Sequence, residues 1–459
     1  MLNKFLVYVT IILFLNTAKV LSSDDIPVLV IAPSKKPQSI STVGTSVVVL
    51  DENFLQNSSE YFLGDVLASN TTSANFFQNG GHGSSSAIQL RGLPKRYSTV
   101  YIDGVKMSDP SSVSGDYDFN HILTSQISRV EILKGNQSSV YGSGAIGGTI
   151  NITTKKGQPG KKKSVMFNTG SHKTNNYSIS FSGANEEDNY YVGFERFQTE
   201  GMSAMTHNDE KDGYKNNSLT ANYGKILSDN LNFKSNLRLT ETNKQYDKEV
   251  TSASATHNEE EDGMQASGNM SLEYKVNEKF TNTVTLANTY IKRVYQAAPG
   301  SGNPQKDNYY GDRYSYSYKG NYNYNLDNSV VFGIEREDDH IGYNANATGI
   351  KDESYYTTSS YFDYQKRATE KTYITLGTRF DDHSVIGAEQ AARLTAAHVY
   401  DGNTKFKASW GTGFRYPSLY EMYIVYANSS KNLSTMQAEQ SMGYDLGIEK
   451  NFPSLDLNL

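Results

Sequence analysis

The chain has 459 residues, with 43 Lys and Arg against 49 Asp and Glu, and it contains no Cys. The mildly acidic balance argues against nucleic-acid binding, and the absence of Cys excludes disulfides and thiolate chemistry. Only 37% of the residues are hydrophobic, although 34 are Tyr. This composition favours sheets with one wet face and with tyrosine rings at an interface.

The N-terminus is predicted to be a cleaved signal peptide, residues 1–22. Lys4 precedes an apolar run over 5–15, which is shorter than the roughly 20 apolar residues that a membrane-spanning helix needs. Val20 and Ser22 are the small residues before a cut near Ser22. We therefore expect an exported protein, and no other stretch reads as a spanning helix.

Residues 40–156 predict a small α+β domain. Strand patterns occur at 47–51, 98–105 and 127–135, and a helix is predicted near 58–69. Within this domain Gly142, Gly144 and Gly147 match the dinucleotide-binding pattern G-x-G-x-x-G. A β-branched strand pattern follows them instead of the helix that such a site requires, so we predict a tight turn and no nucleotide.

Residues 157–459 predict a transmembrane antiparallel β-barrel. Apolar and polar residues alternate, as in SYSYKGNYNYNL from Ser315 to Leu326. Further runs of this kind occur at 177–182, 190–197, 218–223, 231–239, 280–286, 330–335, 373–380, 404–410 and 442–448. Short turns alternate with long polar loops such as 199–216 and 244–266, which is typical of outer-membrane barrels. A soluble β-sandwich is the alternative, because its strands also alternate.

The sequence carries no motif for catalysis, and we expect no enzyme. The eight His residues show no H-x-x-x-H spacing, and neither a nucleophile elbow nor a P-loop is present. Glu335 and Arg336 within IEREDDH are interpreted as a charged barrel rim.

The phrases IQLRG, VYIDGV, RVEILKG and VYGSGAIGGTINI occur in this order between residues 88 and 152. They resemble the plug domain of TonB-dependent outer-membrane receptors. DGYKNNSLTANYG, TKFKASWGTGFRYPSLYEMY and NLSTMQAEQSMGYDLGIE extend the resemblance into the barrel, where it is strongest to the cobalamin-receptor branch. The resemblance implies a mainly β fold in which an N-terminal α+β plug lies inside the barrel.

The resemblance also implies a function: TonB-dependent import of cobalamin or a related corrinoid across the outer membrane, by a monomer surrounded by outer-membrane lipid. A siderophore or haem receptor on the same scaffold is an alternative, and a non-transporting remnant or surface interaction protein is another. The family's barrel has 22 strands, whereas the residues after the plug supply about 14 or 15 at roughly 20 residues each. We therefore expect an incomplete, C-shaped barrel around an intact plug, from a split gene or a fragment.

The predicted contact with TonB lies in the segment 23–39, between the signal peptide and the plug. The family pairs a short extended strand here with TonB, which pulls on the plug. The matching residues are Ile26, Pro27, Val28, Leu29, Val30, Ile31, Ala32 and Pro33. The two prolines depart from the usual pattern and remove backbone donors. An ordinary first strand of the plug is the alternative interpretation.

The resemblance further implies ligand and metal positions. The ligand would contact outward plug loops at Ser85, Ala87, Pro94, Val113 and Ser114. Ala87 stands where a hydroxyl is expected and Pro94 where an amide is expected, so a different corrinoid or another metal chelate remains an alternative. A structural Ca²⁺ would order the outer loops through Asn208, Glu210, Asp212, Tyr246 and Asp247, with Asp262 or Glu261 completing the oxygen ligands. Ser203 replaces an expected Asp, and simple solvation of these acidic loops is the alternative. No other cofactor is expected.

Overall fold

The structure is a computed structural model that describes residues 28–71, 74–203, 210–247, 259–296, 306–325, 327–345, 349–426, 433–452 and 457–458. The predicted signal peptide and the predicted contact residues Ile26 and Pro27 lie outside these residues. No helix in the described part of the chain is both long and apolar enough to cross a membrane.

The plug is a small α+β unit built on a five-stranded sheet in the order β3-β8-β9-β6-β7. Its β6 and β9 are parallel and its other pairs are antiparallel. Two further pairs, β1-β2 and β4-β5, form separate two-stranded sheets. The elements are β1 (Leu29–Val30), η1 (Ala32–Ser34), β2 (Gln38–Ser39), η2 (Ile40–Thr42), β3 (Ser46–Leu50), α2 (Glu52–Asn57), α3 (Leu63–Asn70), β4 (Ala74–Gln78), β5 (Ser86–Leu90), η3 (Lys95–Tyr97), β6 (Ser98–Ile102), β7 (Val105–Lys106), η4 (Phe119–His121), η5 (Thr124–Gln126), β8 (Ile127–Lys134), α4 (Ser138–Tyr141) and β9 (Gly148–Thr154).

The plug has its own hydrophobic core. Leu63, Val66 and Leu67 of helix α3 belong to one core cluster with sheet residues such as Ile132 and Ile150, and all five are fully buried. Burial of each such side chain contributes about 1.5–3 kcal/mol. The core therefore gives the plug a stability that does not depend on lipid.

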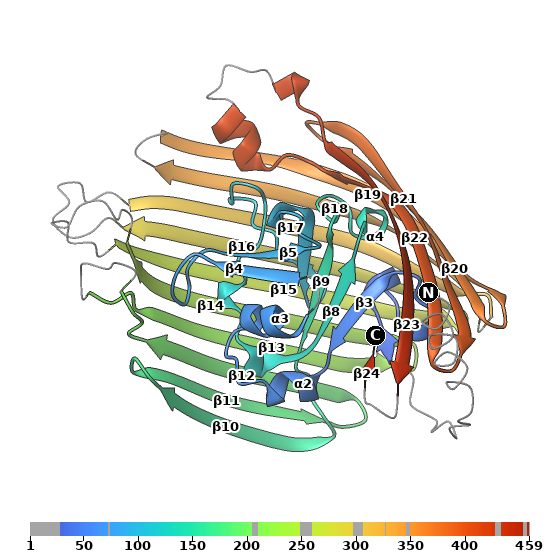
Figure 1. Ribbon diagram of the computed structural model, residues 1–459, viewed down its shortest axis with the longest axis horizontal. Coiled ribbons are helices and arrows are strands. Elements are labelled where there is room, and N and C mark those ends of the chain that lie inside the picture. Colours follow the sequence, from blue (N-terminus) through green and yellow to red (C-terminus); the bar gives the residue numbers. More distant parts are fainter. Residues whose placement is uncertain are drawn as a thin grey trace, which may run out of the picture.

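The barrel region is one antiparallel sheet in which β10 to β24 pair in chain order. Figure 1 shows this curved sheet, green to red, around the blue and cyan plug. Its elements are β10 (Gly160–Gly170), β11 (Thr174–Ala184), β12 (Asp188–Thr199), β13 (Tyr214–Ser228), β14 (Leu231–Tyr246), β15 (Glu259–Asn277), β16 (Phe280–Gln296), β17 (Lys306–Asn323), β18 (Asn328–Ala345), β19 (Gly349–Thr369), β20 (Thr372–His383), β21 (Gly387–Asp401), β22 (Thr404–Arg415), the π-helix η6 (Glu421–Tyr426), η8 (Leu433–Thr435), β23 (Glu439–Phe452) and β24 (Leu457–Asn458).

The predicted strand number and the open, C-shaped barrel are confirmed. The sheet has 15 strands, of which β24 is a two-residue pairing. Among the described residues β10 pairs only with β11, and no ladder joins it to β23 or β24. Two strand edges therefore carry unpaired backbone groups, and each such group costs several kcal/mol in lipid.

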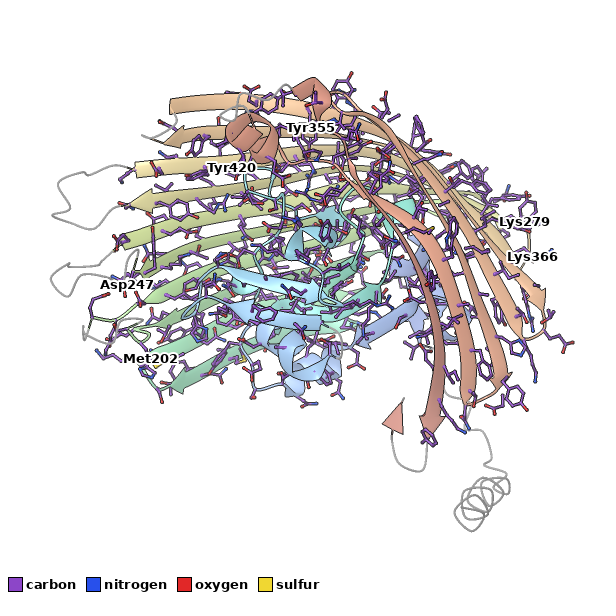
Figure 2. All side chains as sticks on the ribbon, turned by 45° about the horizontal axis from the view of Figure 1, so that its top comes forward. Met202, Asp247, Lys279, Tyr355, Lys366 and Tyr420 are labelled. Atoms are coloured by element: carbon purple, nitrogen blue, oxygen red, sulfur yellow. The ribbon has the colours of Figure 1, made fainter. Side chains whose placement is uncertain are left out.

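The predicted alternation of faces is confirmed along the strands. Leu237 on β14 is 43% exposed on the outer face, while its neighbour Arg238 is buried against the plug. Figure 2 shows side chains on both faces of the curved sheet. On β17 Tyr314 and Tyr316 are about half exposed, whereas Arg313, directly before Tyr314, is buried. The apolar face thus points outward, where lipid would lie, and the polar face points at the plug.

Two boundaries differ from the sequence predictions. The helix predicted near 58–69 begins later, at Leu63, because residues 58–62 are not helical and Phe62 forms a bridge with Leu123. A separate helix, α2, ends at Asn57, before the predicted range. The loop predicted over 244–266 is shorter, because β15 already begins at Glu259. Strand ends beyond the apolar belt carry polar residues on both faces, so alternation of hydrophobicity cannot reveal them.

Candidate functional site

The two ends of the barrel differ in their connections. At one end short turns join neighbouring strands, as between β15 and β16 at Asn277–Phe280. At the other end the described strands stop before long connections such as 247–259 and 296–306. Figure 2 shows Lys279 and Lys366 at the first end and Asp247 and Met202 at the second. Outer-membrane barrels carry short turns on the periplasmic side and long loops outside, which gives the sheet its orientation.

The predicted ligand residues lie on plug segments at the outer end. Ser85 and Pro94 are exposed, Val113 is 56% exposed, and Ala87 and Ser114 are half-buried. Lys95 ties these segments together: its Nζ lies 3.1 Å from Asp116 Oδ2 and donates to the carbonyl of Ser86 at 3.4 Å. The structure therefore brings the three predicted segments to one surface, although a ligand-binding role for them stays a prediction.

Barrel residues complete this outer mouth, and the sequence analysis did not select them. Ser418 Oγ donates to the carbonyl of Val113 at 2.8 Å, and Arg415 Nη2 donates to the carbonyl of Ser114 at 3.1 Å. Glu421 holds both: it pairs with Arg415 at 2.6 Å and accepts from Ser418 N at 2.8 Å. The signal was present in GFRYPSLYE, which the resemblance covers, but only the fold shows that this segment turns inward onto the plug.

A polar cavity of about 90 Å³ lies beneath the mouth, between the plug and strands β14 to β16. Its charged residues pair with one another: Lys244 with Glu261 at 2.5 Å and Arg293 with Asp109 at 3.1 Å. Burial lowers the pKa of the plug residue His121 to about 4, so its imidazole is neutral near pH 7. The cavity thus offers hydrogen-bonding groups with balanced charge.

The segment predicted to contact TonB is folded at the periplasmic end of the plug. Val30 and Ala32 are buried, whereas Val28, Leu29 and Ile31 are each about half exposed. Strand β1 pairs antiparallel with β2, where Leu29 faces Ser39. It is a strand, as both interpretations required, but it belongs to its own two-stranded sheet and not to the plug's main sheet.

Side chains of the plug hold this segment through its backbone. Glu131 Oε2 accepts from Ile31 N at 3.0 Å and from Ala32 N at 2.8 Å. The hydroxyl of Tyr141 donates to the carbonyl of Ala32 at 2.7 Å. Because charged acceptors strengthen hydrogen bonds, the carboxylate of Glu131 is the main holding group.

The barrel holds the end of the same segment. Arg393 Nη2 donates to the carbonyl of Pro33 at 2.6 Å, and Lys35 Nζ lies 3.7 Å from Glu335 Oε2. Pro33 lies at the start of η1, beyond β1, so it removes no donor from the β1 ladder. A role in coupling to TonB stays a prediction for residues 28–33.

Three of the predicted metal ligands come together. Carboxylate oxygens of Glu210, Asp212 and Asp247 lie within 4.8 Å of one another. Burial, with the nearby Asp247 and Asp212 charges, raises the pKa of Glu210 to about 7. Crowded carboxylates that resist ionisation form a donor set that suits a hard cation such as Ca²⁺.

The other predicted metal ligands do not belong to this cluster of described carboxylates. Asn208 lies outside the described residues. Asp262 points to the outer face of β15, where it accepts from Asn243 Nδ2 at 2.9 Å and from Gln296 Nε2 at 2.6 Å. Glu261 points inward to Lys244, and Tyr246 ends β14 beside Asp247 in sequence. Within the described residues the cluster therefore consists of the three carboxylates.

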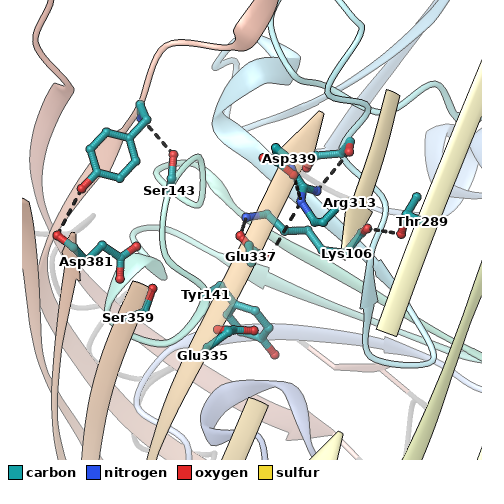
Figure 3. A network of polar contacts seen from close by, with 12 residues as sticks. Lys106, Tyr141, Ser143, Thr289, Arg313, Glu335, Glu337, Asp339, Ser359 and Asp381 are labelled. Carbon is teal, nitrogen blue, oxygen red and sulfur yellow. Dashed lines mark hydrogen bonds and ion pairs between the residues drawn. The ribbon is translucent and has the colours of Figure 1, made fainter. Parts of the chain in front are cut away.

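A network of charged residues joins the plug to the inner face of β16 to β20 (Figure 3). Lys106 of the plug lies 2.8 Å from Glu337, and Arg313 lies 2.6 Å from Asp339. Glu335 joins the same inner face through Arg379 at 3.1 Å, whereas Arg336 points outward to Asp338. Glu335 and Arg336 thus lie on opposite faces, which excludes them as an acid–base pair.

The glycine-rich turn lies against both the plug sheet and the barrel. Gly147 N donates to the carbonyl of Tyr97 at 2.7 Å. A Cβ on Gly148 would lie 2.1 Å from the carbonyl oxygen of Leu133, so only glycine fits there. The strand β9 follows directly, and the predicted tight turn is confirmed.

Comparison with known proteins agrees with this architecture. The family description "TonB-dependent Receptor Plug Domain" matches residues 39–149, and "TonB dependent receptor-like, beta-barrel" matches residues 166–459. The chain is 24% identical over 396 residues to the vitamin B12 transporter BtuB of Photobacterium profundum, covering 83% of this chain and 60% of that protein. It is 22% identical over 412 residues to BtuB of Vibrio cholerae, covering 86% and 64%.

Solved structures share the fold. A point mutant of the Pseudomonas aeruginosa ferric enterobactin receptor PfeA, in complex with enterobactin, superposes with a TM-score of 0.76 at 16% identity, covering 90% of this chain and 70% of that one. The copper transporter OprC superposes with a TM-score of 0.71 at 14% identity, covering 90% and 71%. The chain spans less than two thirds of the length of the two BtuB relatives. Because both family descriptions match and the curved sheet encloses a plug, the chain belongs to the TonB-dependent receptor family, whose members are outer-membrane proteins.

Proposed function

We propose that this chain is the plug and the larger part of the barrel of a receptor that imports cobalamin or a related corrinoid, driven by TonB. The observation that carries the proposal is the two-ended plug. Its outer end presents Ser85, Pro94 and Val113 on one surface, and its periplasmic end presents the half-exposed strand β1. An outer membrane has no energy source of its own, so a plug with these two ends fits import powered from the inner membrane.

Strand β1 suits TonB because of its geometry. A separate two-stranded sheet with Val28, Leu29 and Ile31 about half exposed offers a strand for pairing with TonB once its holding contacts break. The contacts that hold it are hydrogen bonds and an ion pair, which a mechanical pull can break one after another.

The corrinoid assignment is supported by the two curated relatives named BtuB. The similarity of fold to siderophore and copper receptors supports a metal chelate as the second candidate. Ala87 and Pro94 supply no side-chain hydrogen bond, and each such group lost from a ligand site costs about 1 kcal/mol. Within the first candidate, this difference predicts that cobalamin binds more weakly here than in a receptor that keeps both groups.

We also propose that Glu210, Asp212 and Asp247 bind Ca²⁺ and order the outer loops around the mouth. The three carboxylates supply oxygen ligands within bonding reach of one ion, and other oxygens of the loops would complete its shell. The cation would relieve the repulsion that raises the pKa of Glu210.

The proposed function is tested by binding and uptake in cells that display the chain in their outer membrane. Labelled cyanocobalamin and ferric enterobactin are compared, each with and without TonB. We expect cyanocobalamin to bind and to enter only with TonB, and Val30→Pro to abolish uptake while binding persists, since proline blocks strand pairing. Uptake of ferric enterobactin alone would favour the second candidate. Binding of neither would favour a non-transporting interaction protein, and uptake indifferent to Val30→Pro would show that strand β1 does not couple transport to TonB.

A further inference from the structure

The β4–β5 hairpin of the plug, seen in blue in Figure 1, carries the pair Asn79–Gly80 in its loop. This is the one place in the sequence where a glycine follows an asparagine. Both residues are exposed, and the loop leads into Ser85 and Ala87, two of the residues predicted to contact ligand. A chemical change in this loop therefore bears on the mouth of the receptor.

The later part of this loop is anchored to the barrel, whereas its tip is open. The imidazole of His82 meets the ring of Phe197 on β12, with the ring centroids 5.2 Å apart. A Cβ on Gly83 would lie 2.3 Å from the ring of Tyr214, so the backbone packs directly on β13. A Cβ on Gly81 would meet no atom within 4 Å. The tip can therefore change its backbone conformation while the anchor stays in place.

The side chain of Asn79 differs from those of asparagines in the short turns of the barrel. The Oδ1 atoms of Asn185 and Asn277 each accept from the main-chain N–H two residues on, at 2.8 and 2.9 Å, as is usual for asparagine in turns. The main-chain N–H of Asn79 donates to the carbonyl of Ser85 at 3.1 Å. Its carboxamide makes no hydrogen bond with any described residue, so its Cγ is open to attack.

The main-chain nitrogen of Gly80 is available as the attacking group. Gln78 Nε2 donates to the carbonyl of Gly80 at 3.1 Å, whereas the N–H of Gly80 donates to no acceptor in the described part of the chain. A glycine has no side chain to obstruct the approach of its nitrogen to the preceding side chain, and its backbone rotates more freely than that of any other residue. Attacking nitrogen and target carbon are therefore both unhindered at this pair.

The reaction open to such a pair needs only water. The nitrogen of Gly80 forms a bond to Cγ of Asn79, and the bond from Cγ to the side-chain nitrogen breaks. That nitrogen leaves as ammonia and takes with it the proton that the Gly80 nitrogen loses. Water then opens the five-membered imide at either of its two carbonyl carbons. One opening gives aspartate, and the other gives isoaspartate, in which the chain continues through the side-chain carbon.

We propose that Asn79 is a site of spontaneous deamidation and that its conversion alters the mouth of the receptor. The product carries a carboxylate where a neutral amide stood. In isoaspartate the backbone also gains a CH₂ group between Gln78 and Gly80. The site thus ages with the protein, without an enzyme or a cofactor.

The added backbone atom acts on the hairpin because the loop is anchored behind it. Gly83 is fixed against the ring of Tyr214, so the extra length is taken up between Gln78 and that anchor. The hydrogen bond from Asn79 N to the carbonyl of Ser85 closes the hairpin beside the pair Gln78–Ser86, and it is lost when the spacing changes. The effect on ligand binding rests on the proposed function: a displaced Ser85 weakens the binding of a corrinoid.

The first experiment follows the reaction by mass. The folded chain, purified in detergent, is incubated at 37 °C and pH 8, and peptide sequencing by mass spectrometry locates each converted asparagine. Asn185 and Asn277, whose side chains are hydrogen-bonded in turns, are the matched controls in the same chain. We expect Asn79 to convert at least tenfold faster than either control. Conversion of Asn79 within twofold of the controls overturns the proposal.

The second measurement tests the chemistry of the step. The attacking nitrogen of Gly80 must lose its proton, so we expect conversion of Asn79 to be at least fivefold slower at pH 6 than at pH 8. Both products should form, and transfer of a labelled methyl group by an isoaspartate methyltransferase detects isoaspartate in the peptide that contains position 79. A rate that does not change with pH, or a product without isoaspartate, overturns attack by Gly80.

The third experiment measures the consequence at the mouth. The parent chain and Asn79→Gln, whose longer side chain does not form the five-membered ring, are incubated side by side. We expect the incubated parent to bind cyanocobalamin with a Kd at least threefold higher than before incubation, and its β4–β5 loop to be cut faster by added protease, while Asn79→Gln keeps both values. An unchanged Kd in the converted parent overturns the effect on the mouth. If the fresh parent binds no cyanocobalamin, the corrinoid assignment fails, and the mass and protease measurements still decide the deamidation.

Discussion

The plug and the barrel bury opposite kinds of side chain. The plug packs Leu63, Ile132 and Ile150 inside and presents polar groups to its surroundings. The barrel exposes Leu286 and Ile334 on its outer face and buries Arg313 and other charged residues against the plug. The plug is therefore stabilised like a soluble domain, whereas the barrel depends on its ladder of hydrogen bonds and on lipid.

Charged side chains that are buried inside the barrel form ion pairs with one another. Arg313 with Asp339 and Arg379 with Asp381 are ion pairs at 2.6 Å, and both pairs are almost fully buried. Such pairs add little net stability but penalise any arrangement that leaves one partner alone. The same arginines donate to plug carbonyls, Arg313 to Ser108 at 3.1 Å and Arg379 to Val140 at 3.3 Å, so they also help to fix the position of the plug.

The largest expected effect breaks the plug and spares the barrel. Gly148→Val places a Cβ 2.1 Å from the carbonyl oxygen of Leu133 at a positive φ of 148°. We expect a loss of about 3 kcal/mol or more in plug stability and rapid cleavage of the plug by added protease, with the strands retained in circular dichroism. Gly402→Ala, where nothing lies within 4 Å, is the control. An intact plug in the Gly148 variant would contradict the packing described for β8 and β9.

The next largest effect is expected on the stability of the barrel and not on that of the plug. Ile334→Lys puts a charge on the outer face of β18, at a side chain that is 60% exposed, and a lysine at the bilayer midplane costs about 2–4 kcal/mol. We expect a lower denaturant midpoint for the barrel in bilayers. Ser317→Lys on the inward face of β17 should change it by less than about 1 kcal/mol, because that face is polar. Equal effects of the two substitutions would mean that the outer face does not contact lipid.

A smaller effect concerns the junction between plug and N-terminal segment. Glu131→Gln removes the charged acceptor of Ile31 N and Ala32 N, and hydrogen bonds to a charged group contribute about 1.5–3 kcal/mol. We expect a spin label at position 29 to become more mobile while the denaturation midpoint of the barrel stays unchanged. Glu187→Gln, on an exposed turn, is the control. An immobile label in the Glu131 variant would place the holding force elsewhere in the segment.

The smallest effect is on the outer loops and depends on pH. Glu210 has a pKa raised to about 7, so the native loops bind its proton more tightly than the unfolded chain does. Without a cation, loop stability therefore falls as pH rises from the ordinary carboxyl range through about 7. Ca²⁺ should bind more weakly below that pH, where it competes with the proton, and calorimetry at pH 6 and pH 8 measures the difference. Asp212→Asn with Asp247→Asn should abolish Ca²⁺ binding, and binding that persists would contradict the proposed site.

Local patterns in the sequence were sufficient to predict part of this architecture. Alternation placed Leu237 outward and Arg238 inward, because successive residues of a strand must face opposite sides. The β-branched run after Gly148 predicted a strand in place of a helix, which excluded a nucleotide site. The acidic residues at 210, 212 and 247 could be grouped only through the resemblance, since the last two are 35 positions apart in the sequence.

The sequence by itself determined the strand pattern, the outward apolar face and the separate plug, since these depend on side-chain period and composition along a short stretch. Only the tertiary structure decided which residues meet: that Arg415 and Ser418 turn inward onto the plug, that Glu131 holds the backbone of Ile31 and Ala32, and that a polar cavity lies between the plug and β14 to β16. These contacts join residues up to about 300 positions apart in the chain. Their partners are set by strand register and by the position of the plug in the barrel, which no local pattern encodes.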